Sequence, residues 1–300
     1  MRLELTPEGG DPLSSFGKLE KTSLIPFHGF SPLKSLYMSS MTLSHPQIFN
    51  LIRSSPFLED LSLIGHDIDK DSNPDGPQAA VPSTSSVLAG SLELPTTGGT
   101  EYITRRLLDL PGGLRFQQLT FPCLYYEDIR WMMELVVRCS DTLERLDIRC
   151  RPPCTCVLVL RWSRELPPPT DDSSSTSIDL SKAKGLGHVD FWPGLPNVGW
   201  ITAALQTITP NHQDLRHISI HIWQILTFVS TGENKRIMEE QVLGQWLELD
   251  RFLIKFWESH SIRPKVVCMD KGSKEKQVRM RNSMGCLLPE ATKRGIVDLV

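Results

Sequence analysis

Long hydrophobic segments are absent from this sequence. The longest purely aliphatic run is Val157 to Leu160, whereas a membrane-spanning helix needs roughly 18 apolar residues or more. The first residues, MRLELTPEGGD, place acids and glycines where a signal peptide would carry an apolar segment. We therefore expect a protein that neither spans a membrane nor enters the secretory route.

A marked excess of one charge is also missing. The chain carries 32 Lys and Arg against 35 Asp and Glu, a net charge of −3, whereas general nucleic-acid-binding proteins are usually basic. The 7 cysteines are odd in number, and no Asn-x-Ser/Thr sequon occurs. Disulfide frameworks and glycosylation are typical of secreted proteins, so we expect an intracellular location, cytoplasm or nucleus, with no nucleic acid or membrane as partner.

Signature motifs of catalysis are lacking as well. The sequence contains no G-x-x-x-x-G-K-[ST] phosphate loop, no G-x-G-x-x-G after a candidate strand, no G-x-S-x-G and no H-E-x-x-H. The cluster Cys150, Cys154 and Cys156 lacks a partner pair at zinc-finger spacing. The absence of these motifs does not exclude an enzyme, but our first expectation is a protein that is not an enzyme and that binds no metal or cofactor.

A recurring phrase, Leu-x-x-Leu-x-Leu with apolar replacements, is the strongest positive feature. Its copies start at residues 33, 58, 89, 116, 143, 186 and 215, so most intervals lie near the roughly 20 to 29 residues of leucine-rich repeats. Each phrase predicts a short strand whose alternate apolar residues point inward. Amphipathic helices are expected between strands, at Ser44–Ser55, Glu127–Cys139 and Val198–Ile208. The pattern predicts an α/β fold, an irregular leucine-rich-repeat solenoid with a parallel sheet on the concave face and helices on the convex face.

The domain organisation follows from this repeat. Residues 1–241 are predicted to form the solenoid, and residues 242–300 its C-terminal helical cap within the same domain. Two segments, about 69–86 and about 166–177, are rich in Pro, Ser and Asp and have little apolar surface to bury. We expect both to be mobile surface inserts.

Four terminal elements complete the prediction. Arg2–Leu5 is a possible strand, Val242–His260 a long amphipathic helix, and Lys265–Met269 a further strand. The basic run from Lys271 to Arg281 is interpreted as a solvated loop, the commonest meaning of such a run.

The outward residues of neighbouring parallel strands should form one continuous surface, at about 4.8 Å per strand. Arg, Trp and His, the residue types enriched at binding hot spots, concentrate on the later strands. All of these side chains are expected to be exposed, and ordinary hydrophilic sheet surface is the alternative interpretation. The candidate binding residues are Arg145, Asp147, Arg149, His188, Asp190, Trp192, His217, Ser219 and His221.

Several longer strings carry a family resemblance. SLIPFHGFSPLKSLYM, SPFLEDLSL, ITRRLLDLPGGLRFQQLTF, CSDTLERLDI and ATKRGIVDLV resemble the leucine-rich-repeat region of the F-box-like proteins of mushroom-forming fungi (basidiomycetes). The resemblance implies a recognition subunit whose repeats choose a substrate for a ubiquitin ligase. No helical segment typical of an F-box is visible before the first repeat, so we do not expect a Skp-type adaptor as a partner.

Two functions remain open on these grounds. The first is a non-catalytic protein–protein recognition module, resembling the substrate-recognition repeats of F-box-type ubiquitin ligase receptors, with an unknown protein partner. The alternative is a metal-dependent enzyme that would use His188, Asp190 and His217 at the His- and Asp-rich end of the concave face.

Overall fold

One parallel sheet runs through the whole described part of the chain. The computed structural model describes residues 2–5, 33–39, 48–49, 52, 55, 57–64, 88–94, 100–110, 112–121, 129–149, 178–193, 198–222, 233–268 and 274–299. Its ten strands follow one another in sequence order, and every ladder between neighbours is parallel. The strands are β1 Arg2–Leu5, β2 Ser35–Ser39, β3 Asp60–Ile64, β4 Ser91–Glu93, β5 Gln118–Phe121, β6 Arg145–Arg149, β7 His188–Trp192, β8 His217–Ile222, β9 Lys265–Cys268 and β10 Val297–Leu299.

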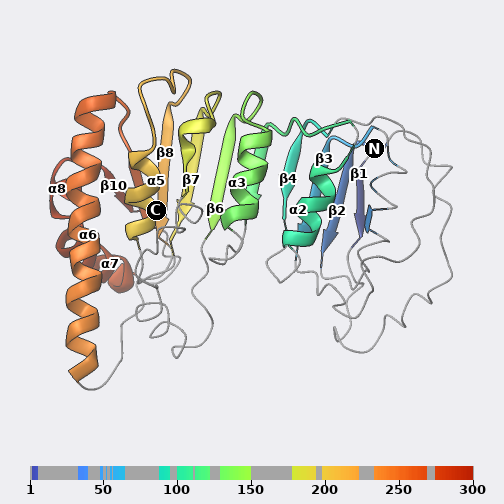
Figure 1. Cartoon of the computed structure of the whole chain (residues 1–300). Helices are drawn as coiled ribbons and strands as arrows, with labels where there is room; N and C mark the ends of the chain where they lie inside the picture. Colours follow the sequence, from blue (N-terminus) through green and yellow to red (C-terminus); the bar gives the residue numbers. More distant parts are fainter. Residues whose placement is uncertain are drawn as a thin grey trace, which may run out of the picture.

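Helices lie on one side of this sheet (Figure 1). They are α2 Thr100–Leu108, α3 Ile129–Arg138 and α5 Gly199–Gln206. Before β7 the chain forms a short 3-10 helix, η3 Leu180–Lys182. The predicted fold class, an α/β fold with an open parallel sheet and the order of a repeat solenoid, is confirmed. The helix α2 was missing from the sequence prediction.

The C-terminal end is covered by the long helix α6, Glu233–His260, with α7 Lys274–Leu287 and α8 Pro289–Lys293 beside it (Figure 1). The helix α6 begins earlier than the predicted start at Val242. The prediction of a loop from Lys271 to Arg281 was wrong, because most of that run belongs to α7. The buried Met284 packs the later part of α7 into the core. The charged first part of the helix shows no apolar periodicity that could have indicated this.

Some predicted segments lie outside the described residues. Both predicted inserts, about 69–86 and about 166–177, fall there, as does the cysteine cluster around Cys154. Of the helix expected at Ser44–Ser55, only a few residues are described; Ile48, Phe49 and Ile52 are helical and buried.

The core is built from the inward residues of the strands, as the alternation predicts. The first inward row is at most 1% exposed at every strand from β2 to β8, and its members pair across the ladders. This row consists of Leu36, Leu61, Leu92, Leu119, Leu146, Val189 and Ile218. A one-residue slip would turn the whole row outward, so burial of the row confirms the predicted register.

A repeated hydrogen bond aligns the strands at the edge where they begin. The carbonyl of the residue before one strand accepts from two successive N–H groups of the next repeat: Gln117 O accepts from Glu144 N at 2.8 Å and from Arg145 N at 2.9 Å. Glu144 O accepts in the same way from Gly187 N and His188 N. These bonds satisfy backbone groups that the helix-to-strand turns would otherwise leave unpaired. They therefore hold the first residue of each strand at one level.

Candidate recognition face

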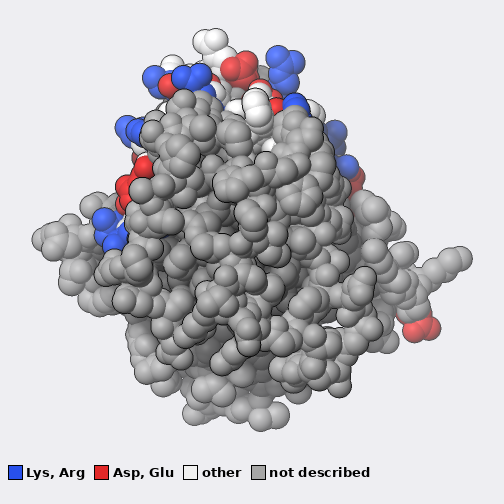
Figure 2. All heavy atoms as spheres, turned by 90° about the vertical axis from the view of Figure 1, so that its right-hand side faces the viewer, with Lys and Arg blue, Asp and Glu red and all other residues white. Residues whose placement is uncertain are grey.

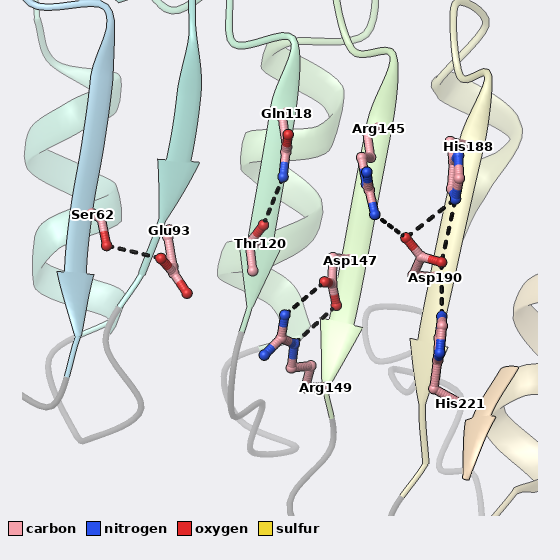
Figure 3. Close-up of polar contacts among 10 residues, drawn as sticks. All are labelled: Ser62, Glu93, Gln118, Thr120, Arg145, Asp147, Arg149, His188, Asp190 and His221. Carbon is pink, nitrogen blue, oxygen red and sulfur yellow. Dashed lines mark hydrogen bonds and ion pairs between the residues drawn. The ribbon is translucent and has the colours of Figure 1, made fainter. Parts of the chain in front are cut away.

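The face of the sheet opposite α2, α3 and α5, here called the open face, carries the outward side chains (Figure 3). Its β6–β8 part brings together the residues named from sequence, because parallel pairing sets equivalent positions side by side. Arg145 pairs with His188 and His188 with His217, Asp147 pairs with Asp190 and Asp190 with Ser219, and Arg149 pairs with Trp192.

Asp190 is the centre of a polar cluster that joins three strands (Figure 3). Its carboxylate accepts a hydrogen bond from Arg145 Nη2 at 2.8 Å and from His221 Nε2 at 3.0 Å, and His188 Nε2 lies 3.3 Å away. The Asp190 side chain is only 4% exposed. One buried carboxylate therefore orients the partly exposed guanidinium of Arg145, the partly exposed imidazole of His188 and the largely buried imidazole of His221.

The charge state of Asp190 follows from these neighbours. Burial alone would raise the pKa of Asp190, but the hydrogen bond from His221, the charge of His188 and the hydrogen bond and charge of Arg145 together lower it to about 2. The carboxylate is therefore ionised at any physiological pH, and the cluster keeps a fixed negative centre below its nitrogen-bearing side chains.

A stacked column stands beside this cluster. The Arg149 guanidinium lies 4.8 Å from the centre of the Trp192 ring, and the rings of Trp192 and His221 are stacked at 4.2 Å with an angle of 11°. Asp147 accepts two hydrogen bonds from Arg149, at 3.2 Å from Nε and 3.0 Å from Nη2. Donation to Asp147 raises the pKa of Arg149 against the opposing effect of its partial burial. The column therefore places a charged guanidinium and two stacked rings on three neighbouring strands.

The expectation that all candidate side chains are exposed was wrong for the acids. Asp147 is 5% exposed and Asp190 is 3% exposed. Arg149 folds back over Asp147, and Asp190 lies beneath the side chains that it binds. Residues on an outward row are covered when longer neighbours on adjacent strands lean across them. These two acids therefore hold the site together, and a partner would meet the Arg, His and Trp side chains above them.

The histidines also differ from expectation. Both His217 and His221 were expected to be exposed as outward strand residues, but only His217 is exposed, and His221 is largely buried against Trp192 and Asp190. The ring of His217 instead lies 5.1 Å from that of His188. Within the described ranges, no group of at least three His, Cys, Asp or Glu side chains is arranged to hold a metal ion. The metal set His188, Asp190 and His217 is thus not assembled here.

Sequence reasoning missed a groove at the edge where β5–β8 begin. Its volume is about 710 Å³, and its lining comes from four successive repeats. The repeat of β7 contributes Gly185 and Gly187 to the lining. At the equivalent positions the repeat of β6 has Thr142 and Glu144, and the repeat of β8 has Asp214 and Arg216. The two glycines in one turn could have indicated the groove from sequence, because a turn without side chains between turns that carry larger residues leaves a hollow. The lining residues are Gln117, Asp141, Thr142, Glu144, Arg145, Gly185, Gly187, His188, Asp214, Arg216 and His217.

Charge is mixed on the described surface seen from the β1 end, where Lys and Arg lie beside Asp and Glu rather than in a patch of one sign (Figure 2). None of the described helices is both long and apolar enough to cross a membrane.

Comparison with known proteins gives no relative for this chain: no family model matches it, and neither the curated proteins nor the solved structures contain a match.

Proposed function

We propose that this chain is a non-catalytic module that recognises a protein partner through the β6–β8 part of its open face. The stacked column of Arg149, Trp192 and His221 is the observation that carries the proposal. Its Arg and Trp belong to the residue types that dominate binding energy in protein interfaces. Since all three stand on strands of one sheet and are held by ring stacking and by Asp147, little conformational entropy would be lost on binding.

The polar cluster next to the column supports the same function. Arg145 and His188 are partly exposed, at 46% and 31% of their side chains, and both are oriented by the buried Asp190. Nitrogen donors held in place by a buried carboxylate can bond a partner without first being ordered. Arg and Trp side chains at the centre, with oriented hydrogen-bond donors beside them, match the composition of a protein interface, which has an aromatic and Arg-rich core and a polar rim.

The family resemblance narrows the proposal further. The repeat strings resemble the substrate-recognition repeats of F-box-type ubiquitin ligase receptors of fungi, so the partner would be a protein selected for ubiquitination. The order of repeats in the sheet agrees with that resemblance at the level of fold only.

Affinity purification with mass spectrometry tests the recognition function. The wild-type chain and two variants serve as baits: Trp192→Ala removes the centre of the column, and Ser62→Ala is the control on the β2–β5 part of the same face. We expect at least one protein whose recovery falls with Trp192→Ala and not with Ser62→Ala. With that protein purified, Trp192→Ala should weaken binding by about 2 kcal/mol or more, the size of a hot-spot loss. Equal recovery with both variants would refute the proposed site.

A further inference from the structure

We propose, on the basis of this recognition function, that the groove at the start of β5–β8 binds an extended segment of the partner in which acidic and basic side chains alternate. The groove adjoins the Asp190 cluster, because Arg145 and His188 belong both to that cluster and to the groove lining. It thereby gives the partner a second contact region with chemistry of its own.

One wall of the groove consists of nitrogen donors. Arg145 donates through Nη2 to Asp190 and forms no ion pair with any other described residue, while His188 presents its ring beside that of His217. The wall is therefore suited to carboxylate side chains, which accept hydrogen bonds from guanidinium and imidazole N–H groups.

The other wall, formed by the turns before the strands, carries carboxylates. Asp141, Glu144 and Asp214 are exposed and form no ion pair with any described residue, and Arg216 is the single basic side chain among them. Because the charge of Arg145 is balanced by the ionised Asp190, the remaining fixed charges of the lining sum to an excess of acid. A purely anionic ligand such as a nucleic acid would be repelled there, whereas Lys or Arg side chains would be attracted.

The length of the groove fits a strand-like peptide. Four successive strand starts span roughly 14 Å at about 4.8 Å per strand, which about four residues of an extended chain cover. Successive side chains of such a chain point to opposite sides. A peptide with alternating acidic and basic residues would thus direct one sign to the donor wall and the other to the carboxylate wall. The hollow left by Gly185 and Gly187 gives room for its backbone.

Synthetic peptides of equal length, two of them with the same composition, provide the test. Fluorescein-labelled octapeptides with alternating Glu and Lys, with four Glu followed by four Lys, and with Glu alone are titrated with the full chain at low ionic strength, and anisotropy is measured. We expect the alternating peptide to bind about tenfold more tightly than the block peptide, as the product of a few exposed ion pairs that each change the affinity by about two- to fivefold. Equal affinity for the first two, or tighter binding of the Glu peptide, would overturn the proposal.

Variants locate the binding. Glu144→Lys and Asp214→Lys, both exposed, should each weaken binding of the alternating peptide by about two- to fivefold. Gly185→Leu should fill the hollow and reduce binding further, since a Cβ at this position meets neighbouring backbone at no less than 3.5 Å and the chain should still fold. Gly244→Leu on α6, where nothing lies within 4 Å, is the matched control and should leave binding unchanged. Unchanged binding in both charge variants would sink the inference even if Gly185→Leu did not fold.

Failure of the groove and failure of the recognition face are distinguishable. If the partner found by purification is lost with Trp192→Ala but retained with Glu144→Lys and Asp214→Lys, the recognition function stands and the groove inference falls. If the partner is retained by Trp192→Ala and by both charge variants, the recognition function and the groove inference both fall.

Discussion

The β2–β5 and β6–β8 parts of the open face share one backbone register and carry different side chains. On β2–β5 serine hydroxyls and carboxylates of neighbouring strands bond one another. Asp60 accepts from Ser35 Oγ at 2.8 Å and from both the N–H and the hydroxyl of Ser91 at 2.9 Å, and Ser62 donates to Glu93 at 2.8 Å. On β6–β8 the buried acids are similar, but Arg, His and Trp side chains rise above them.

The two parts differ in the side chains that donate to the bridging carboxylate. In both parts a carboxylate bridges neighbouring repeats, Asp60 in the first and Asp190 in the second. The donors to Asp60 are serine hydroxyls and a backbone N–H, which end at the level of the sheet. The donors to Asp190 are the longer side chains of Arg145, His188 and His221, of which those of Arg145 and His188 are 46% and 31% exposed. A carboxylate that bridges repeats therefore occurs in both parts, and under the proposed function the one in β6–β8 also orients side chains that would bind the partner.

The largest expected effect would show what the two parts have in common. Leu61→Ala in β3 and Leu146→Ala in β6 each remove a side chain that is at most 1% exposed from the same inward row. Each should lower the free energy of unfolding by about 2–5 kcal/mol, because methyl groups lose their burial and the cavity between stacked repeats relaxes only partly. Urea denaturation measures both. A cost below about 1 kcal/mol at either site would mean that the row does not continue through both parts.

A smaller, pH-dependent effect concerns the Asp190 cluster alone. Asp190→Asn should lower stability by about 2 kcal/mol near pH 7, since hydrogen bonds to a buried charge are lost. The pKa of Asp190 in the folded chain, about 2, lies below its ordinary value of 3.8, so the stabilisation exists above pH 4 and disappears as pH falls from about 4 to about 2. Denaturation of wild type and variant across pH 2–7 should show the two curves converging at the acidic end. Curves that stay parallel would show that the charge of Asp190 does not stabilise the fold.

The last prediction compares the effects of two glycine substitutions on stability. A Cβ at Gly90 would overlap the Asp60 carboxylate and lie 2.8 Å from Glu59 O, whereas a Cβ at Gly187 would lie 3.4 Å from its nearest neighbour, Asp214 O. Gly90→Ala should therefore cost about 1–3 kcal/mol, the usual price of overpacking, and Gly187→Ala about 0.5 kcal/mol or less. Thermal or urea unfolding of the pair decides this. A tolerated Gly90→Ala would mean that the Asp60 bridge is not rigid.

The elements that sequence reasoning found share a local cause. Strands β2–β8 and the helices α3 and α5 have apolar residues at spacings of two or of three to four, which the chain displays without knowledge of its neighbours. The helix α2 and the helical state of α7 were missed because Arg and Lys dilute their apolar positions. In α7 the deciding contact is burial of Met284, which depends on the packing of distant segments.

The sequence by itself determined the inward rows, the parallel order of the strands and the concentration of Arg, His and Trp on β6–β8, because strand alternation and repeat spacing are local properties. Only the tertiary structure decided which side chains meet. Asp190 binds His221 rather than His217, Asp147 lies under Arg149, and two glycines open a groove between turns. Those outcomes depend on side chains from strands up to 45 residues apart leaning across one another at the spacing of a parallel sheet.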